Sequence, residues 1–258
     1  MNPRNSQLVH LLIKGVLVPL IVWVLITVVE SFGGGAPEGR LVEQPDSLVY
    51  FPTALATQKS SEQYFPLVVA FSPGGDAQSL IQFWKPLADK YQMVVYASKL
   101  YHNDMPAEEL KAKSQAIYQS LITLTQNYPI ETRRMIYTGL SGGGSFSYFM
   151  NYYYPNTAAA LVVNTGRMWE DWVYNPIAAN LPAAKARMSN PPVVIFLASP
   201  TDFRYPHMQR DKQLTDQLGW KSRWIEFTGG HTLAPYADYE QALDWLQAQP
   251  EWNPAFRR

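Results

Sequence analysis

Short apolar runs alternate with amphipathic stretches along most of this 258-residue chain. The apolar runs are expected to be strands: 66–71, 93–97, 135–138, 160–164, 193–198 and 223–227. The stretches between them carry apolar residues at helical spacing: 76–91, 106–127, 145–154, 208–218 and 235–246. Apolar strands that alternate with helices are typical of a mostly parallel sheet covered by helices on both faces. We therefore predict an α/β fold, with residues 48–51 as an antiparallel edge strand and an irregular insertion at residues 166–192.

Composition excludes several classes of function. The formal net charge is zero and no run of lysine or arginine stands out, so we expect no nucleic-acid partner. The chain has no cysteine, which excludes disulfides, a thiolate nucleophile and cysteine-ligated zinc. Hydrophobic residues make up 47% of the chain, which is enough for a large buried core.

The N-terminal region carries a separate signal. Residues 8–29 are almost wholly apolar, interrupted by His10 and Lys14, and a bilayer-spanning helix needs about 20 such residues. We expect residues 1–30 to be a retained signal-anchor; a cleaved signal peptide and a buried or interfacial helix are the alternatives. Arg4 and Lys14 favour a cytoplasmic N-terminus.

This orientation determines where the remaining chain is expected to lie. A retained anchor would hold the protein at a membrane with its folded part outside the cytoplasm, whereas cleavage would release a secreted protein. Residues 31–47, rich in glycine at their start, are expected to form a flexible tether. Residues 48–250 are then the folded domain.

A Gly-x-Ser-x-Gly motif follows one of the expected strands. Residues 139–143 read GLSGG, between the strand at 135–138 and the helix that begins near residue 145. In this context the serine stands at the apex of a sharp strand-to-helix turn, and glycines are needed where a side chain would clash with neighbouring backbone. The N–H groups of the following helix favour negative charge at the same point. Ser141 is therefore the candidate nucleophile.

A serine nucleophile needs a general base, and the base needs an orienting acid. His231 follows the last expected strand on a glycine-rich loop, and Asp202 follows the strand at 193–198. Both lie downstream of Ser141, in the order Ser, Asp, His. Asp171, in the irregular insertion, and Asp238, on the exposed side of a helix, are the rival acids.

An oxyanion hole would need two N–H donors. The backbone N–H of Gly142, directly after the serine, is one candidate. The second should come from the loop after residues 66–71, where Pro73 has no N–H and Gly74 or Gly75 can present one.

Together these motifs resemble the α/β-hydrolase superfamily, and within it the branch of esterases, dienelactone hydrolases and polyhydroxybutyrate depolymerases. The resemblance rests on four segments and covers about residues 66–247: FSPGG at 71–75, GLSGG at 139–143, SPTD at 199–202 and GGH at 229–231. It implies the α/β-hydrolase fold and a two-step hydrolysis through an acyl-enzyme. Two departures stand out, since Ser72-Pro73 replaces the common His-Gly of the oxyanion loop and the nucleophile is serine where dienelactone hydrolases have cysteine.

These observations favour a serine hydrolase that cleaves a small or polymeric carboxylic ester and needs no metal or organic cofactor. A serine peptidase with the same triad is one alternative, and a non-catalytic, membrane-tethered binding domain is another. Trp169, Trp172 and Tyr174 could wall a substrate pocket, although core packing is the simpler interpretation. His102 lies after another expected strand and is a further candidate for the cleft.

Overall fold

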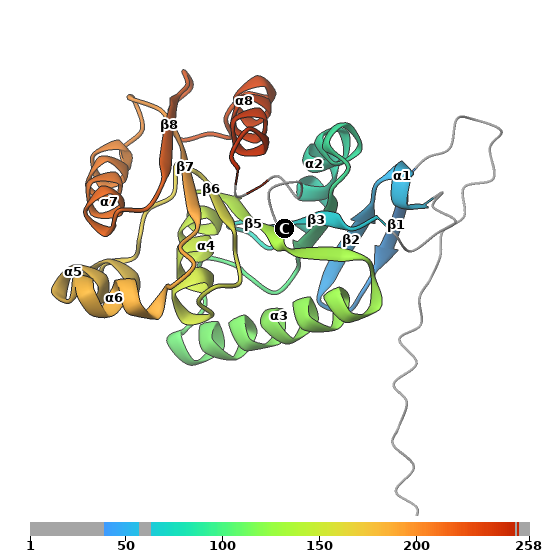
Figure 1. The fold of residues 1–258 in the computed structure, drawn as a ribbon, viewed down its shortest axis with the longest axis horizontal. Helices are drawn as coiled ribbons and strands as arrows, with labels where there is room; N and C mark the ends of the chain where they lie inside the picture. Colours follow the sequence, from blue (N-terminus) through green and yellow to red (C-terminus); the bar gives the residue numbers. More distant parts are fainter. Residues whose placement is uncertain (1–38, 57–62, 251, 253–258) are drawn as a thin grey trace, which may run out of the picture.

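The structure is a computed structural model that describes residues 39–56, 63–250 and 252. The described residues form one eight-stranded sheet with the order β1-β2-β4-β3-β5-β6-β7-β8 (Figure 1). Its strands are β1 Arg40–Glu43, β2 Ser47–Phe51, β3 Phe65–Phe71, β4 Val94–Ser98, β5 Ile130–Leu140, β6 Ala160–Asn164, β7 Val193–Ala198 and β8 Ser222–Glu226. Strands β3 to β8 are parallel to one another. At one end of the sheet, β2 pairs antiparallel with β4, and β1 pairs antiparallel with β2. The predicted mostly parallel sheet is therefore confirmed.

Helices cover both faces of this sheet, as the alternating pattern predicts. One face is packed by α2 (Ala77–Tyr91) and α8 (Tyr236–Gln247), and the other by α3 (Ala107–Asn127), α4 (Gly142–Tyr153) and α7 (Tyr205–Leu218). Figure 1 shows α2 and α8 above the sheet and α3 below it. The central strands β3, β4, β6 and β7 are buried almost throughout, which explains why they read as continuous apolar runs.

The insertion after β6 forms short helices. It contains one turn of π-helix, Glu170–Tyr174, followed by α5 (Asn175–Ala179) and α6 (Leu181–Arg187). Prolines occupy the first turn of both α5 and α6, where the missing N–H leaves no hydrogen bond broken. These interruptions explain why no continuous helical periodicity is visible over residues 166–192.

The N-terminal side of the sheet differs from the expectation. Residues 40–43 form β1, the true edge strand, although the sequence predicts a tether over residues 31–47 and places the edge at residues 48–51. The side chain of Val42 is fully buried opposite Val49, and Lys99 Nζ binds Glu43 Oε1 at 2.7 Å. A four-residue strand is too short to show a clear alternating pattern in the sequence. Residues 40–43 form a strand because they pair with β2.

A short helix, α1 (Thr53–Ala56), follows β2.

None of the helices in the described part of the chain combines the length and apolar character needed to span a bilayer. The predicted signal-anchor at residues 1–30 lies outside the described residues, as does the first part of the predicted tether.

The burial of β1 gives a first prediction. Replacing Val42 by aspartate would place a carboxylate in the core, and we expect the free energy of unfolding to fall by roughly 3 kcal/mol or more. The matched control is Leu41→Asp on the same strand, because Leu41 is 36% exposed and the change there should stay within about 0.5 kcal/mol. Denaturant unfolding measures both, and equal effects would contradict the assignment of β1 to the folded domain.

Candidate active site

The carboxyl ends of the parallel strands bring three distant segments together at one edge of the sheet. Ser141 directly follows β5, Asp202 lies four residues after β7, and His231 lies five residues after β8. Residues at this edge of an open α/β sheet commonly bind ligands. The local backbone of each segment determines where its side chain points.

The turn at Ser141 is strained and tightly packed. Ser141 has φ 55° and ψ −117°, a conformation that residues with a side chain rarely adopt. Its N–H donates to the carbonyl of Asn164 at 2.8 Å, which ties the turn to the end of β6. A Cβ at Gly143 would lie 2.0 Å from the carbonyl oxygen of Phe71, and one at Gly139 would lie 2.5 Å from the same atom. The motif glycines are therefore required because α4 crosses directly over β3 and β5.

A chain of hydrogen bonds joins the three side chains. His231 Nδ1 lies 2.7 Å from Asp202 Oδ2, and His231 Nε2 lies 2.8 Å from Ser141 Oγ. A carboxylate can only accept, so Nδ1 carries the proton and the neutral imidazole offers Nε2 as the acceptor of the serine O–H. The carboxylate of Asp202 is fully buried, whereas the imidazole is 31% exposed toward solvent. This arrangement can remove a proton from Ser141 and stabilise the imidazolium that results.

The loops that carry the acid and the base are fastened to each other. Asp202 Oδ1 accepts the backbone N–H of Arg204 at 2.6 Å, which leaves Oδ2 for the histidine. The backbone N–H of Gly230 donates to Ser199 Oγ at 3.0 Å. Gly229 and Gly230 have φ values of 144° and 72°, and this glycine backbone lets the loop turn back over the site.

A buried asparagine that the sequence analysis did not single out also holds the histidine loop. The side chain of Asn164, at the end of β6, donates to the carbonyl of Thr232 at 3.2 Å and accepts the N–H of Ala234 at 2.7 Å. It also accepts from the hydroxyl of Tyr239 at 3.2 Å. The available signal was its place at a strand's carboxyl end, but nothing in the sequence indicates that a loop 70 residues away would bind it.

The candidate oxyanion donors differ in whether their N–H groups already have an acceptor. Gly142 is the first residue of α4, where the N–H has no acceptor in the preceding turn and can face a ligand. The N–H groups of Gly74 and Gly75 both donate within their own turn, to Ser72 Oγ at 3.3 Å and to the Ser72 carbonyl at 3.2 Å. The side chain of Asn103, which the sequence analysis missed, packs directly on Gly142, since a Cβ there would lie 1.7 Å from its Oδ1.

The candidate pocket residues lie partly in the core and partly on an exposed loop. Trp169 and Trp172 pack on Phe149 of α4 with ring centroids 5.6 and 5.7 Å apart, so both contribute to the core while remaining partly exposed. Tyr174 packs against the same core and lies 3.8 Å from the guanidinium of Arg210. His102 is exposed on the loop that contains Asn103.

The rival acids are engaged elsewhere. Asp171 is exposed and accepts from Asn175 at 3.3 Å, and Asp238 lies in the first turn of α8. Among the residues that the structure describes, no group of three or more His, Asp or Glu side chains could hold a metal ion.

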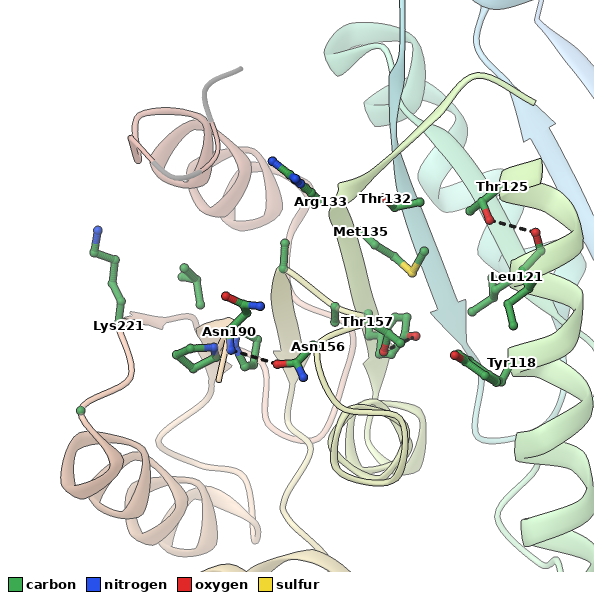
Figure 2. A pocket seen from close by; sticks show the side chains of 18 residues that line it. Tyr118, Leu121, Thr125, Thr132, Arg133, Met135, Asn156, Thr157, Asn190 and Lys221 are labelled. Atoms are coloured by element: carbon green, nitrogen blue, oxygen red, sulfur yellow. Dashed lines mark hydrogen bonds between the residues drawn. The ribbon is translucent and has the colours of Figure 1, made fainter. Parts of the chain in front are cut away.

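Two cavities differ in their relation to this site. A cavity of about 930 Å³ lies at the amino ends of β5 to β8, the sheet edge opposite the three side chains, and Figure 2 shows Thr132, Met135, Asn190 and Lys221 around it. A smaller cavity of about 140 Å³ has a mostly apolar lining that includes Leu140 and Leu233 but none of the three side chains. Of its lining residues, Leu140 directly precedes Ser141 in the chain and Leu233 follows His231 by two residues.

The fold is that of the α/β-hydrolases. No family model and no curated protein matches the sequence, but solved structures match the fold. A fluorophosphonate-binding serine hydrolase of Staphylococcus aureus, FphF, is 14% identical, with 83% of this chain and 97% of that chain covered and a TM-score of 0.56. A carboxylesterase from Mesorhizobium loti is 13% identical over 82% of this chain and all of its own, with a TM-score of 0.60.

A peptidase shares the fold as well. The acylaminoacyl peptidase of Pyrococcus horikoshii is 12% identical over 81% of this chain and 39% of its own length, with a TM-score of 0.57. What these proteins share with this chain at such identities is the α/β-hydrolase fold, and the fold expected from the sequence motifs is thereby confirmed.

The crowded turn gives a second prediction. Gly143→Ala would force a methyl group against the Phe71 carbonyl, so we expect the thermal midpoint to fall by several degrees and the site to be distorted. Gly74→Ala is the matched control, because no atom lies within 4 Å of its Cβ position and its N–H is retained. A Gly143→Ala protein that unfolds at the wild-type temperature would contradict the close approach of α4 and β3.

Proposed function

We propose that this protein is a serine hydrolase that cleaves carboxylic esters through an acyl-enzyme intermediate. The observation that carries the proposal is the unbroken hydrogen-bond chain from Asp202 through His231 to Ser141. In the first step Ser141 Oγ attacks the ester carbonyl while His231 Nε2 takes its proton, and the leaving alcohol receives that proton. In the second step His231 removes a proton from water, which attacks the acyl-enzyme. The carboxylic acid leaves, and His231 returns the proton to Ser141 Oγ.

Charge on the tetrahedral oxygen would be stabilised at the start of α4. The N–H of Gly142 and the helix N-terminus favour an anion there, and one such donor is worth about 3 to 4 kcal/mol of transition-state stabilisation. The second donor that we propose is the N–H of Gly74 or Gly75, released from its turn when substrate binds.

A fluorophosphonate probe and a panel of 4-nitrophenyl esters test the proposed activity. We expect covalent labelling of the wild type and none of Ser141→Ala, and a loss in kcat of roughly 10⁴-fold or more for Ser141→Ala. Asp202→Asn should lower kcat by roughly 10³- to 10⁴-fold, because the imidazole loses the acceptor that holds its tautomer. Ser189→Ala is the control, since Ser189 is an exposed serine outside the site.

The outcomes separate the three functions considered. Hydrolysis of the ester panel with no cleavage of matched peptide amides supports an esterase, and the reverse preference supports a peptidase. A correctly folded wild type that the probe does not label, and that hydrolyses neither panel, would support a binding domain that retains the fold without catalysis.

We also propose that residues 1–30 anchor the protein in a membrane, with the folded domain outside the cytoplasm. The support is the apolar run at residues 8–29 and the basic residues Arg4 and Lys14 near its start.

A charge scan of the apolar run tests this proposal. The full-length protein should stay in the membrane pellet after a carbonate wash, whereas the double variant Val24→Arg/Ile26→Arg should be released, since each arginine costs about 2.5 to 3.5 kcal/mol at a helix centre. Leu41→Arg, outside the run, should remain in the pellet. The mass of the N-terminal peptide distinguishes a retained anchor from a cleaved signal, and a wild type found only in the soluble fraction with its N-terminus intact would contradict the proposal.

A further inference from the structure

One arginine beside the triad has a buried nitrogen without a hydrogen-bond partner in the part of the chain that the structure describes. Arg204 stands two residues after Asp202, at the start of α7, and its backbone N–H is bound to the triad carboxylate at 2.6 Å. This bond fixes the position of residue 204 relative to the proposed catalytic acid. The backbone of Arg204 is therefore held in a fixed position beside Asp202.

The guanidinium of Arg204 is partly removed from water without full compensation. Its Nη1 is buried and has no hydrogen-bond partner among the described residues, and the nearby Asp202 carboxylate, which is bound to His231, only partly offsets its charge. Burial, together with the charge of Arg167, lowers the pKa of Arg204 from its ordinary value. A buried donor without a partner costs free energy, and such a group in a native protein is commonly satisfied by water, an ion or a ligand.

The surroundings of Arg204 connect it to the reacting groups. Its Cζ lies 5.5 Å from the centre of the Phe203 ring, and that ring lies 4.6 Å from the imidazole of His231. The charge of Arg204 also acts on the Tyr101 hydroxyl. Burial raises the pKa of that hydroxyl, and the positive charge of Arg204 opposes this rise. The Tyr101 hydroxyl donates to Asn103, and a Cβ on Gly142 would lie 2.9 Å from it. Arg204 is therefore linked to the histidine through Phe203 and, through Tyr101, to the residue that follows the nucleophile.

Other cations reinforce the positive charge on this side of the site. The nearest oxygen of Glu170 is 3.5 Å from Arg167 Nη1 but 2.5 Å from Arg210 Nη1, so Arg167 is only loosely paired. Arg210 also holds Asp211, whose pKa burial raises to about 7, so that carboxyl is partly protonated near neutral pH. Three guanidinium groups thus face Glu170, the partly protonated Asp211 and the Asp202 carboxylate, whose two oxygens are already bound by His231 and by the backbone N–H of Arg204.

The imidazole of His207 does not add to this charge. Burial, and the charges of Arg167 and Arg210, lower its pKa from the ordinary value, which favours the neutral ring near pH 7. The excess of positive charge therefore comes from the arginines.

We propose that Arg204, assisted by Arg167, binds a carboxylate carried by the substrate, so that the ester cleaved at Ser141 belongs to a molecule with a free acid group. The inference rests on the proposed serine hydrolase activity and adds its substrate class. A guanidinium binds a carboxylate through two parallel N–H donors, and such charge-assisted hydrogen bonds are stronger than neutral ones. Phe203, whose side chain is 68% exposed beside His231, provides an apolar wall for the methylene chain between the ester and the acid.

The geometry makes a monoester of a dicarboxylic acid the matching probe. Mono-4-nitrophenyl adipate and 4-nitrophenyl hexanoate have acyl chains of the same length and differ in the terminal carboxylate. A second pair, 4-acetoxybenzoate and 4-acetoxybenzamide, carries the acid on the leaving group. The pair that shows the preference reveals whether the carboxylate belongs to the acyl group or to the alcohol.

The measured quantity is the ratio of kcat/KM for the acid ester to that for its neutral partner. We expect the wild type to favour the acid ester of one pair by about tenfold or more, and Arg204→Met to lower that ratio by about 10- to 100-fold. Arg204→Lys should retain part of the ratio, since it keeps the charge and loses the planar fork. Arg223→Met is the matched control, because Arg223 is an exposed arginine on β8 away from the site, and its ratio should equal that of the wild type.

Fluorophosphonate labelling separates the two ways in which the inference could fail. A labelled wild type that prefers the neutral ester of both pairs, or a ratio that is the same in wild type and Arg204→Met, would overturn the anion subsite and leave the serine hydrolase standing. A wild type that is neither labelled nor active would overturn both. If Arg204→Met does not fold, Arg204→Lys decides, and an unchanged ratio together with normal labelling would overturn the subsite.

Discussion

The close approach of three backbones around Gly143 is the constraint on which the site depends. Helix α4 begins directly above the carbonyl of Phe71 at the end of β3, in a space where no side chain fits. This contact forces the chain into the left-handed conformation at Ser141 and lifts its hydroxyl out of the sheet. The same turn places the N-terminus of α4, with its unpaired N–H groups, beside the nucleophile. The strain is sustained because the flanking strands are buried in a rigid sheet.

Around this turn, polar groups buried at the sheet edge join elements that the sequence keeps far apart. Asn164 binds the Ser141 turn through its carbonyl and the histidine loop through its side chain, so one residue positions both the proposed nucleophile and the proposed base. Ser199 plays a similar role between the acid loop and the histidine loop. Because these donors and acceptors are satisfied only when all three loops are in place, they specify one arrangement of the site.

The electrostatic character of the site is asymmetric. The side formed by α7 and the insertion after β6 is rich in arginine, although the whole chain carries no formal net charge. The proposed reaction needs only the triad and an oxyanion hole, so Arg204, whose Nη1 has no hydrogen-bond partner among the described residues, is left without a role in the chemistry itself. A substrate that supplies a counter-charge would account for this residue and would also give the enzyme a means of selecting among esters.

The sequence by itself determined the parallel core and the three side chains of the candidate triad. Strands such as Val193–Ala198 are buried on both faces and so are continuously apolar, and Ser141, Asp202 and His231 each follow such a strand in a recognisable turn. Only the tertiary structure decided that residues 40–43 extend the sheet, that Asn164 holds the histidine loop and that the buried Nη1 of Arg204 lacks a hydrogen-bond partner among the described residues. The physical reason is that burial patterns and turn chemistry are local in the chain, whereas these contacts join residues that only folding brings together.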